Sequence, residues 1–238
     1  MGIAHASGLT PQPSTAITNG VDLDRFRPSL PKDPAIAAQL NLQNDMFVFG
    51  SCAGVADYKR VDLVIEAASK LRISRPYLIL AIGDPEEDGH RLEEYARQRG
   101  VTQFRYCGFH GDVRGFVSLL NVGFVLSDSI ETISLGSREM LAMGKPLISS
   151  SFAGLKENIV DGHNGFLIRP GQVDDVAAAM RRFLTMSPDE LLRLSANARS
   201  FAEENFTLET QLQETLAVYE KVLNRNQLSS SASGRRRG

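Results

Sequence analysis

The chain has 238 residues, 42% of them hydrophobic and 23% charged, which is ordinary for a globular protein. Lys and Arg total 26 against 28 Asp and Glu, so no positive excess attracts nucleic acid, and we expect no nucleic-acid partner. No apolar run approaches the ~20 residues of a membrane-spanning helix, and no signal segment opens the chain.

Alternating strand and helix patterns fill most of the chain. After a turn at Asn19-Gly20-Val21-Asp22, a short helix is expected over 33–40. Apolar runs predict strands at 46–52, 77–82, 104–107, 122–126, 146–150 and 166–168. Helical spacing predicts helices at 59–71, before Gly100, at 113–120, 174–184, from Pro188 and at 208–223, whereas 229–238 are expected to be disordered.

This alternation predicts an α/β fold, a Rossmann-like doubly wound parallel sheet with helices on both faces. Ligands of such sheets bind at the carboxyl ends of the strands. The loops that follow the first four strands share that edge of the sheet. We therefore expect one rim to carry Lys59, Gly83, Gly108 and Glu131.

Cysteine and histidine contents give no metal signature. Cys52 and Cys107 end apolar strands, and the four histidines are scattered along the chain. Their spacing fits no zinc site, so we expect no bound metal. Free thiols in a reducing cytoplasm fit this pattern better than a disulfide does.

Two acids, Glu131 and Glu139, bracket the start of a predicted helix that follows the strand at 122–126. With Ser134 as N-cap, the next three backbone amides would point outward and offer an anion site. Acids beside an anion site suit a ligand with phosphates and hydroxyls, such as a sugar nucleotide. Taken alone, the two acids fit solvated surface side chains equally well. The chain has neither a G-x-G-x-x-G after its first strand nor a P-loop, which argues against a dinucleotide dehydrogenase or P-loop NTPase.

Several short motifs, taken in order, resemble one family. Residues 129–144 resemble the E-x7-E motif of retaining glycosyltransferases with the two-domain GT-B fold, family 4 in particular. The resemblance extends over roughly residues 8–223 and corresponds to one GT-B half-domain, the C-terminal donor-binding domain with its crossing helix. The other matching residues are Asn19-Gly20-Val21-Asp22, Phe26, Pro28, Lys59, Val61-Asp62-Leu63, Gly83-Asp84, Gly108-Phe109, Gly144, Pro146, Gly154, Glu157, Asp161, Gly162 and Gly165.

The resemblance implies roles for the acids and for one lysine. Glu139 would bind the ribose hydroxyls of the donor nucleotide, and Glu131, as a catalytic residue, would lie beside the hydroxyls of the transferred sugar. Lys59 would neutralise the pyrophosphate leaving group in catalysis; the alternative is that Lys59 merely starts an exposed helix. Glu157 would support the domain core rather than touch the ligand.

The same resemblance implies two donor-binding loops. Gly108 and Phe109 would meet the base of the nucleotide. The other loop would hold the donor phosphates, as a helix N-terminus does physically. Its implied donor-binding residues are Ile133, Ser134, Leu135 and Gly136.

The implied chemistry is retaining transfer from a nucleotide-diphosphate sugar, a UDP- or GDP-sugar, to a saccharide or glycolipid acceptor. No cofactor and no metal are implied, because Lys59 and the helix N-terminus would stabilise the charge of the leaving diphosphate. That diphosphate would itself help to deprotonate the acceptor. The family further implies polysaccharide or lipopolysaccharide biosynthesis and a cytoplasmic location, which includes a peripheral place at the inner face of the membrane.

Two positions depart from the family pattern. Many members have an Arg five residues before the lysine, where this chain has Gly54. Diphosphate binding should therefore weaken unless Arg60 or another cation substitutes. The usual Phe-Gly of the first acid's loop is Ile133-Ser134 here, which is compatible with the motif because Ser can cap a helix.

The resemblance begins where the family's acceptor domain ends. We interpret residues 1–18 as a remnant of the interdomain segment, 19–224 as the donor domain and 225–238 as a disordered tail. The apolar side of the helix at 208–223 would then lack a partner, which predicts a separate acceptor-domain chain or self-association. Three interpretations of the chain stay open: a poorly active half of an enzyme, a module that only binds the donor, and an inactive remnant.

Overall fold

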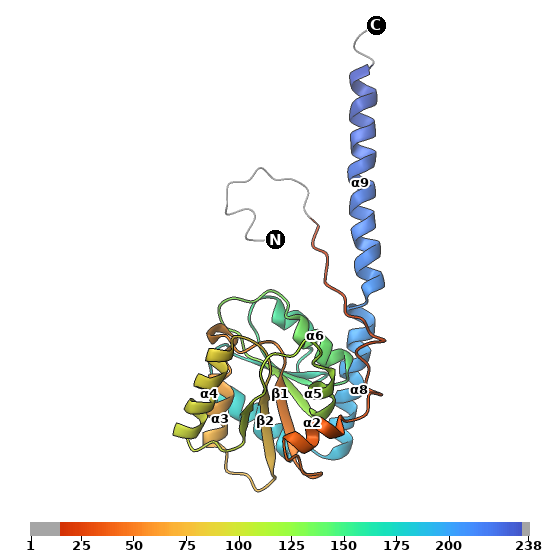
Figure 1. Ribbon diagram of the computed structural model, residues 1–238. Helices are drawn as coiled ribbons and strands as arrows, with labels where there is room; N and C mark the ends of the chain where they lie inside the picture. Colours follow the sequence, from red (N-terminus) through yellow and green to blue (C-terminus); the bar gives the residue numbers. More distant parts are fainter. Residues whose placement is uncertain (1–14, 235–238) are drawn as a thin grey trace. The chain divides into compact units, whose positions relative to one another are not determined.

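The computed structural model (Figure 1) describes the backbone of residues 15–234 and the side chains of residues 15–224. The chain divides into two compact units. The larger is Leu23–Asn205, and the smaller joins residues 15–22 to Phe206 and helix α9 (Leu208–Gly234). All the predicted site residues belong to the larger unit.

Six parallel strands form the sheet of the larger unit, in the order β3-β2-β1-β4-β5-β6. Every residue of β1, β2, β4 and β5 is buried, which explains why these strands read as continuous apolar runs rather than as alternating patterns. The strands are β1 (Phe47–Ser51), β2 (Tyr77–Ala81), β3 (Phe104–Tyr106), β4 (Val122–Val125), β5 (Leu147–Ser150) and β6 (Gly165–Ile168).

Helices cover both faces of this sheet (Figure 1), so the predicted Rossmann-like doubly wound fold is confirmed. Helix α3 packs against α7, and α6 packs against α8. The helical segments are α2 (Pro34–Gln39), η1 (Asp57–Lys59), α3 (Asp62–Lys70), α4 (Glu86–Gln98), α5 (Arg114–Leu119), α6 (Leu135–Ala142), η2 (Ala153–Asn158), α7 (Val173–Thr185) and α8 (Pro188–Asn205).

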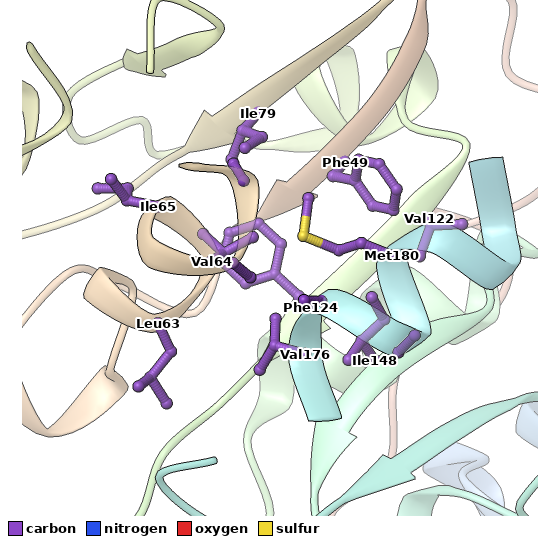
Figure 2. Close-up of a cluster of buried hydrophobic side chains, with 14 of the residues drawn as sticks. Phe49, Leu63, Val64, Ile65, Ile79, Val122, Phe124, Ile148, Val176 and Met180 are labelled. Atoms are coloured by element: carbon purple, nitrogen blue, oxygen red, sulfur yellow. The ribbon is translucent and has the colours of Figure 1, made fainter. Parts of the chain in front are cut away.

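The main hydrophobic core lies between the sheet, α3 and α7 (Figure 2). Phe49 and Phe124 from the sheet meet Val64 of α3 and Met180 of α7, and none of these four side chains is more than 1% exposed. Burial of one such side chain stabilises a fold by about 1.5–3 kcal/mol. The core therefore fixes the strands and, with them, the loops at their carboxyl ends.

The switch point of the sheet lies between β1 and β4. From β1 the chain proceeds to β2 on one side, whereas from β4 it proceeds to β5 on the other. In open parallel sheets, ligands bind beside the loops that follow the strands at such a switch point. We call the four loops 52–58, 82–85, 107–113 and 126–134 the rim.

Two predicted boundaries differ from the structure. The helix predicted over 59–71 begins only at Asp62, because Lys59 lies in η1 and Arg60 adopts a left-handed backbone conformation with φ 52°. Helix α9 continues to Gly234, beyond the predicted helix end at 223, whereas the disordered tail predicted for 225–238 stays a prediction. No proline interrupts this stretch, and Ser and Ala do not break a helix. Residues 235–238 and 1–14 lie outside the described part of the chain.

In the smaller unit, Val21 pairs with Thr207, and the backbone N–H of Gly20 donates to Gln211 Oε1 at 2.8 Å. The apolar side chains predicted to lack a partner on α9 are exposed; Leu212 and Tyr219, for example, are 58% and 65% exposed. The domain limits 19–224 and the binding partner of α9 stay predictions. Among the described residues, no helix has the length and apolar character that crossing a membrane requires.

Candidate functional site

The N-terminus of α6 opens into the rim, and Ser134 caps it as predicted. Ser134 Oγ accepts the backbone N–H of Ser137 at 3.3 Å, and Ser137 Oγ donates to the carbonyl of Ser134 at 2.7 Å. The amides of Leu135 and Gly136 come earlier in the first turn, where no intrahelical acceptor exists. An added Cβ on Gly136 would lie 3.0 Å from the carbonyl oxygen of Cys52, so glycine lets α6 approach the loop after β1 closely.

Lys59 and Glu131 meet across the switch point. Lys59 Nζ donates to Glu131 Oε2 at 2.6 Å, and the hydroxyl of Ser127 donates to the same oxygen at 3.2 Å. The backbone N–H of Thr132 donates to the other oxygen, Oε1, at 3.1 Å. The two charged side chains are only 13% and 8% exposed. Lys59 is therefore not the exposed helix start that the alternative interpretation proposed.

Glu139 lies in the second turn of α6 and is half-buried. Burial raises the pKa of its carboxyl group, the positive charge of Arg25 opposes this rise, and the negative charge of Asp112 adds to it. The neighbouring Cys52 thiol has a raised pKa, chiefly through burial and secondly through the charge of Glu139. Both Cys52 and Cys107 are free thiols, as expected.

The guanidinium of Arg60 is held by two carboxylates. Its Nε and Nη2 donate to the two oxygens of Asp62 at 3.1 and 3.0 Å, and its Nη1 donates to Asp128. These contacts raise the pKa of Arg60. A diphosphate would have to compete with Asp62 and Asp128 for this cation, so the substitution of Arg60 for the arginine missing at Gly54 stays a prediction.

Three glycines join the loops after β1, β2 and β3. The backbone N–H of Gly83 donates to the carbonyl of Gly108 at 2.9 Å, and an added Cβ on Gly83 would lie 2.7 Å from Gly54 Cα. Gly54 itself has φ +88°, a conformation that L residues rarely adopt. The local backbone therefore explains why glycine stands at 54. Phe109, next to Gly108, is 66% exposed on the same rim.

Sequence reasoning missed Asn158, the last residue of η2. Its side chain is fully buried and donates from Nδ2 to the carbonyl of Ile133 at 2.6 Å. Glu157, predicted to support the domain core, has an exposed side chain and acts on Arg138 through its charge. Asn158 directly follows the charged residues Lys156 and Glu157, so no local pattern marked it as buried. Ser127 and Arg25 were also missed, and no local pattern marks either of them.

The structure thus combines a doubly wound α/β domain with a capped helix N-terminus, a lysine and two acids at its switch point. Residues 32–201 match the family described as Glycosyl transferases group 1, and the chain belongs to this family. Within the described residues, no group of three His, Cys, Asp or Glu side chains is arranged to hold a metal ion.

One curated relative and two solved structures illustrate the match. The chain is 28% identical over 236 residues to D-inositol 3-phosphate glycosyltransferase of Stackebrandtia nassauensis, covering 94% of this chain and 52% of the relative. HepE of Anabaena in complex with UDP-glucose has a TM-score of 0.78 at 21% identity, with 86% of this chain and 57% of HepE covered. The C-terminal domain of LpcC from Francisella tularensis has a TM-score of 0.67 at 21% identity, with 79% of this chain and all of that domain covered.

The coverage values locate the match within longer proteins. The chain spans about half the length of the curated relatives it matches. The domain of LpcC is matched over 100% of its length. The chain therefore corresponds to the C-terminal half of a two-domain GT-B glycosyltransferase, as the sequence resemblance predicted.

Proposed function

We propose that this chain supplies the donor-binding half of a retaining glycosyltransferase that uses a UDP- or GDP-sugar. The contact between Lys59 and Glu131 carries this proposal, because it joins a cation and an acid from opposite sides of the switch point beside the open N-terminus of α6. The structural likeness to HepE, whose solved complex contains UDP-glucose, supports a sugar-nucleotide ligand.

The donor would lie along the rim with its phosphates at the first amides of α6. Lys59 would face the same phosphates, and its charge would stabilise the leaving diphosphate without a metal ion. Glu139 would accept hydrogen bonds from the ribose hydroxyls. Glu131, held by Ser127 and Thr132 through its two oxygens, would accept hydrogen bonds from the transferred sugar.

Retention of the configuration at the transferred sugar carbon would follow from the side on which the diphosphate leaves. No protein carboxylate has to attack the sugar, because the acceptor would enter on the face that the diphosphate leaves. The departing phosphate oxygen would take the proton of the acceptor hydroxyl there. Lys59 would balance the charge that accumulates on that phosphate in the transition state.

The acceptor would be a saccharide or glycolipid, bound with the help of a second domain. A closed cleft that holds both substrates is what gives such transfer its speed. We therefore propose that this chain alone binds donor but transfers sugar poorly. A cytoplasmic location, with access to the inner face of the membrane, would suit such acceptors.

Titration calorimetry with UDP and with GDP tests the donor-binding role. The unaltered chain should bind one of them, and Glu139→Ala should weaken binding, since the ribose contact is lost. Glu204→Ala is the matched control, because it removes an exposed Glu near the end of α8, outside the rim. If the unaltered chain binds neither nucleotide, both the enzyme half and the binding module are excluded, and the inactive remnant is favoured.

Donor turnover separates the two remaining alternatives. The chain is incubated with UDP-glucose, or with GDP-mannose if GDP binds better, and with a saccharide acceptor. Transfer by this chain alone would assign an enzyme half, whereas nucleotide binding without transfer would assign a donor-binding module.

A further inference from the structure

The turn that leads into α6 holds a strained residue. Ser134 has φ 53° and ψ 99°, and a non-glycine residue with positive φ is disfavoured. Such a conformation persists only where the surrounding structure fixes it. Ser137 of α6 forms hydrogen bonds back to this turn, and Asn158, which lies outside α6, adds further contacts to it.

Asn158 clamps the turn on both sides of Ser134. Its Nδ2 donates to the carbonyl of Ile133 at 2.6 Å and to Ser137 Oγ at 2.7 Å. Its Oδ1 accepts the Nε–H of Arg138 at 3.1 Å. Both amide hydrogens and the amide oxygen of one buried side chain are thus used on residues 133–138.

The segment that carries Asn158 is itself fixed against the turn. An added Cβ on Gly154 would lie 2.0 Å from the carbonyl oxygen of Thr132, so η2 runs directly beneath the loop. Asn164 Nδ2 donates to the backbone carbonyl of Asn158 at 3.1 Å, which anchors the end of η2. Arg138 is 1% exposed, and burial lowers the pKa of its guanidinium while the charge of Glu157 raises it.

We propose that Asn158 is a positioning residue for the diphosphate of the donor. It sets the Ile133–Ser137 turn so that the amides of Leu135 and Gly136 point into the rim, although Asn158 itself is buried and touches no ligand. The inference rests on the proposed donor-binding function. It adds that recognition of the phosphates, but not of the nucleoside, depends on a side chain beneath the site.

The test compares UDP with uridine, or GDP with guanosine if the chain prefers GDP. Asn158→Ala should weaken UDP binding roughly tenfold to a hundredfold, the worth of one or two charge-assisted hydrogen bonds. Uridine binding should change less than about twofold, because Glu139 and the Gly108 loop are unaltered. Asn121→Ala is the control; Asn121 Oδ1 accepts the N–H of Val48 at 2.8 Å, at the opposite end of the strands from the rim.

A second variant covers the case in which Asn158→Ala does not fold. Ser137→Ala removes the hydroxyl that Nδ2 of Asn158 reaches, together with the bond of that hydroxyl to the carbonyl of Ser134, and leaves Arg138 with its partner. It should weaken UDP binding several-fold and leave uridine binding unchanged, with its fold verified by thermal melting.

Three outcomes would overturn the inference. The first is a folded Asn158→Ala chain that binds UDP as tightly as the unaltered chain. The second is an equal loss of UDP and uridine affinity, which would indicate a general structural defect. The third is an unaltered chain that binds UDP no more tightly than uridine; this result would also remove the proposed phosphate site, whereas the first two leave it standing.

Discussion

Substitution of Gly54 tests why this chain lacks the arginine that many relatives have. At φ +88°, any side chain at 54 requires a left-handed backbone, and its Cβ would lie 3.2 Å from the carbonyl oxygen of Asp84. We expect Gly54→Ala to lower the free energy of unfolding by about 1–3 kcal/mol. Gly54→Arg should lower it by at least as much, because its backbone carries the same strain.

Thermal melting and urea unfolding measure the effect. For a unit of this size, each kcal/mol corresponds to a fall in Tm of about 2–4 °C, so Gly54→Ala should lower Tm by roughly 2–12 °C. Gly100→Ala is the matched control, because Gly100 has φ +71° and no atom within 4 Å of an added Cβ. Gly100→Ala reports the cost of the left-handed backbone alone, and the excess at Gly54 reports the contact with Asp84.

Nucleotide affinity completes the test. An arginine at 54 adds a cation to the rim, but it also disturbs the loop that contacts Gly83, so we expect Gly54→Arg to bind UDP no more tightly than the unaltered chain. A Gly54→Arg chain with unchanged Tm and tenfold tighter UDP binding would refute the reasoning. That result would mean that glycine at 54 merely removes a cation and is not required by the backbone of the loop.

Three further predictions concern charged side chains of the larger unit. Burial raises the pKa of Glu139 above its ordinary 4.5, so the contribution of this group to stability is present below pH 4.5 and is lost as pH rises through the folded pKa. Glu139→Gln should therefore raise Tm at pH 7 and make the stability less dependent on pH. The same variant should bind UDP more weakly. Lys59→Met should lower the free energy of unfolding in urea by about 3–5 kcal/mol, because it leaves the buried charge of Glu131 without its partner. Adding Glu131→Gln should recover at least about 1 kcal/mol, and strictly additive effects of the two substitutions would contradict the buried pair. Burial lowers the pKa of Lys145 from 10.5 to about 8, so the free energy of unfolding should rise between pH 8 and 10.5. Lys145→Met should abolish that rise in urea titrations across this range.

The fold was predictable because its signals are local. Four fully buried strands appear in the sequence as apolar runs, and Ser134 precedes its helix as an N-cap does. The left-handed residue Arg60, which delays α3 to Asp62, carries no such signal, because nothing in the residue type predicts it. The start of α3 therefore deviated because the backbone takes an uncommon conformation at Arg60.

The candidate site was predictable only in part. The rim could be assigned from topology, and the structure brings Lys59 and Glu131 together across 72 residues of sequence. The state of Arg60 was not predictable, because it depends on Asp128, which is 68 residues away and reaches Arg60 only in the folded chain. Asn158 was missed for the same reason, since its partners in the Ile133–Ser137 turn lie 21 to 25 residues earlier.

The contacts among Gly54, Gly83 and Gly108 have an evolutionary consequence. Each loop is shaped by the next, so a substitution acceptable in one relative is harmful in another whose adjoining loops differ. The Cβ of an arginine at 54 would lie 3.2 Å from the carbonyl oxygen of Asp84, so the substitution is better tolerated after a small shift of the 82–85 loop, which makes the order of substitutions matter. Chimeras made with relatives should accordingly exchange residues 52–58, 82–85 and 107–109 as one block, because a single exchanged loop would meet a neighbour shaped for another sequence.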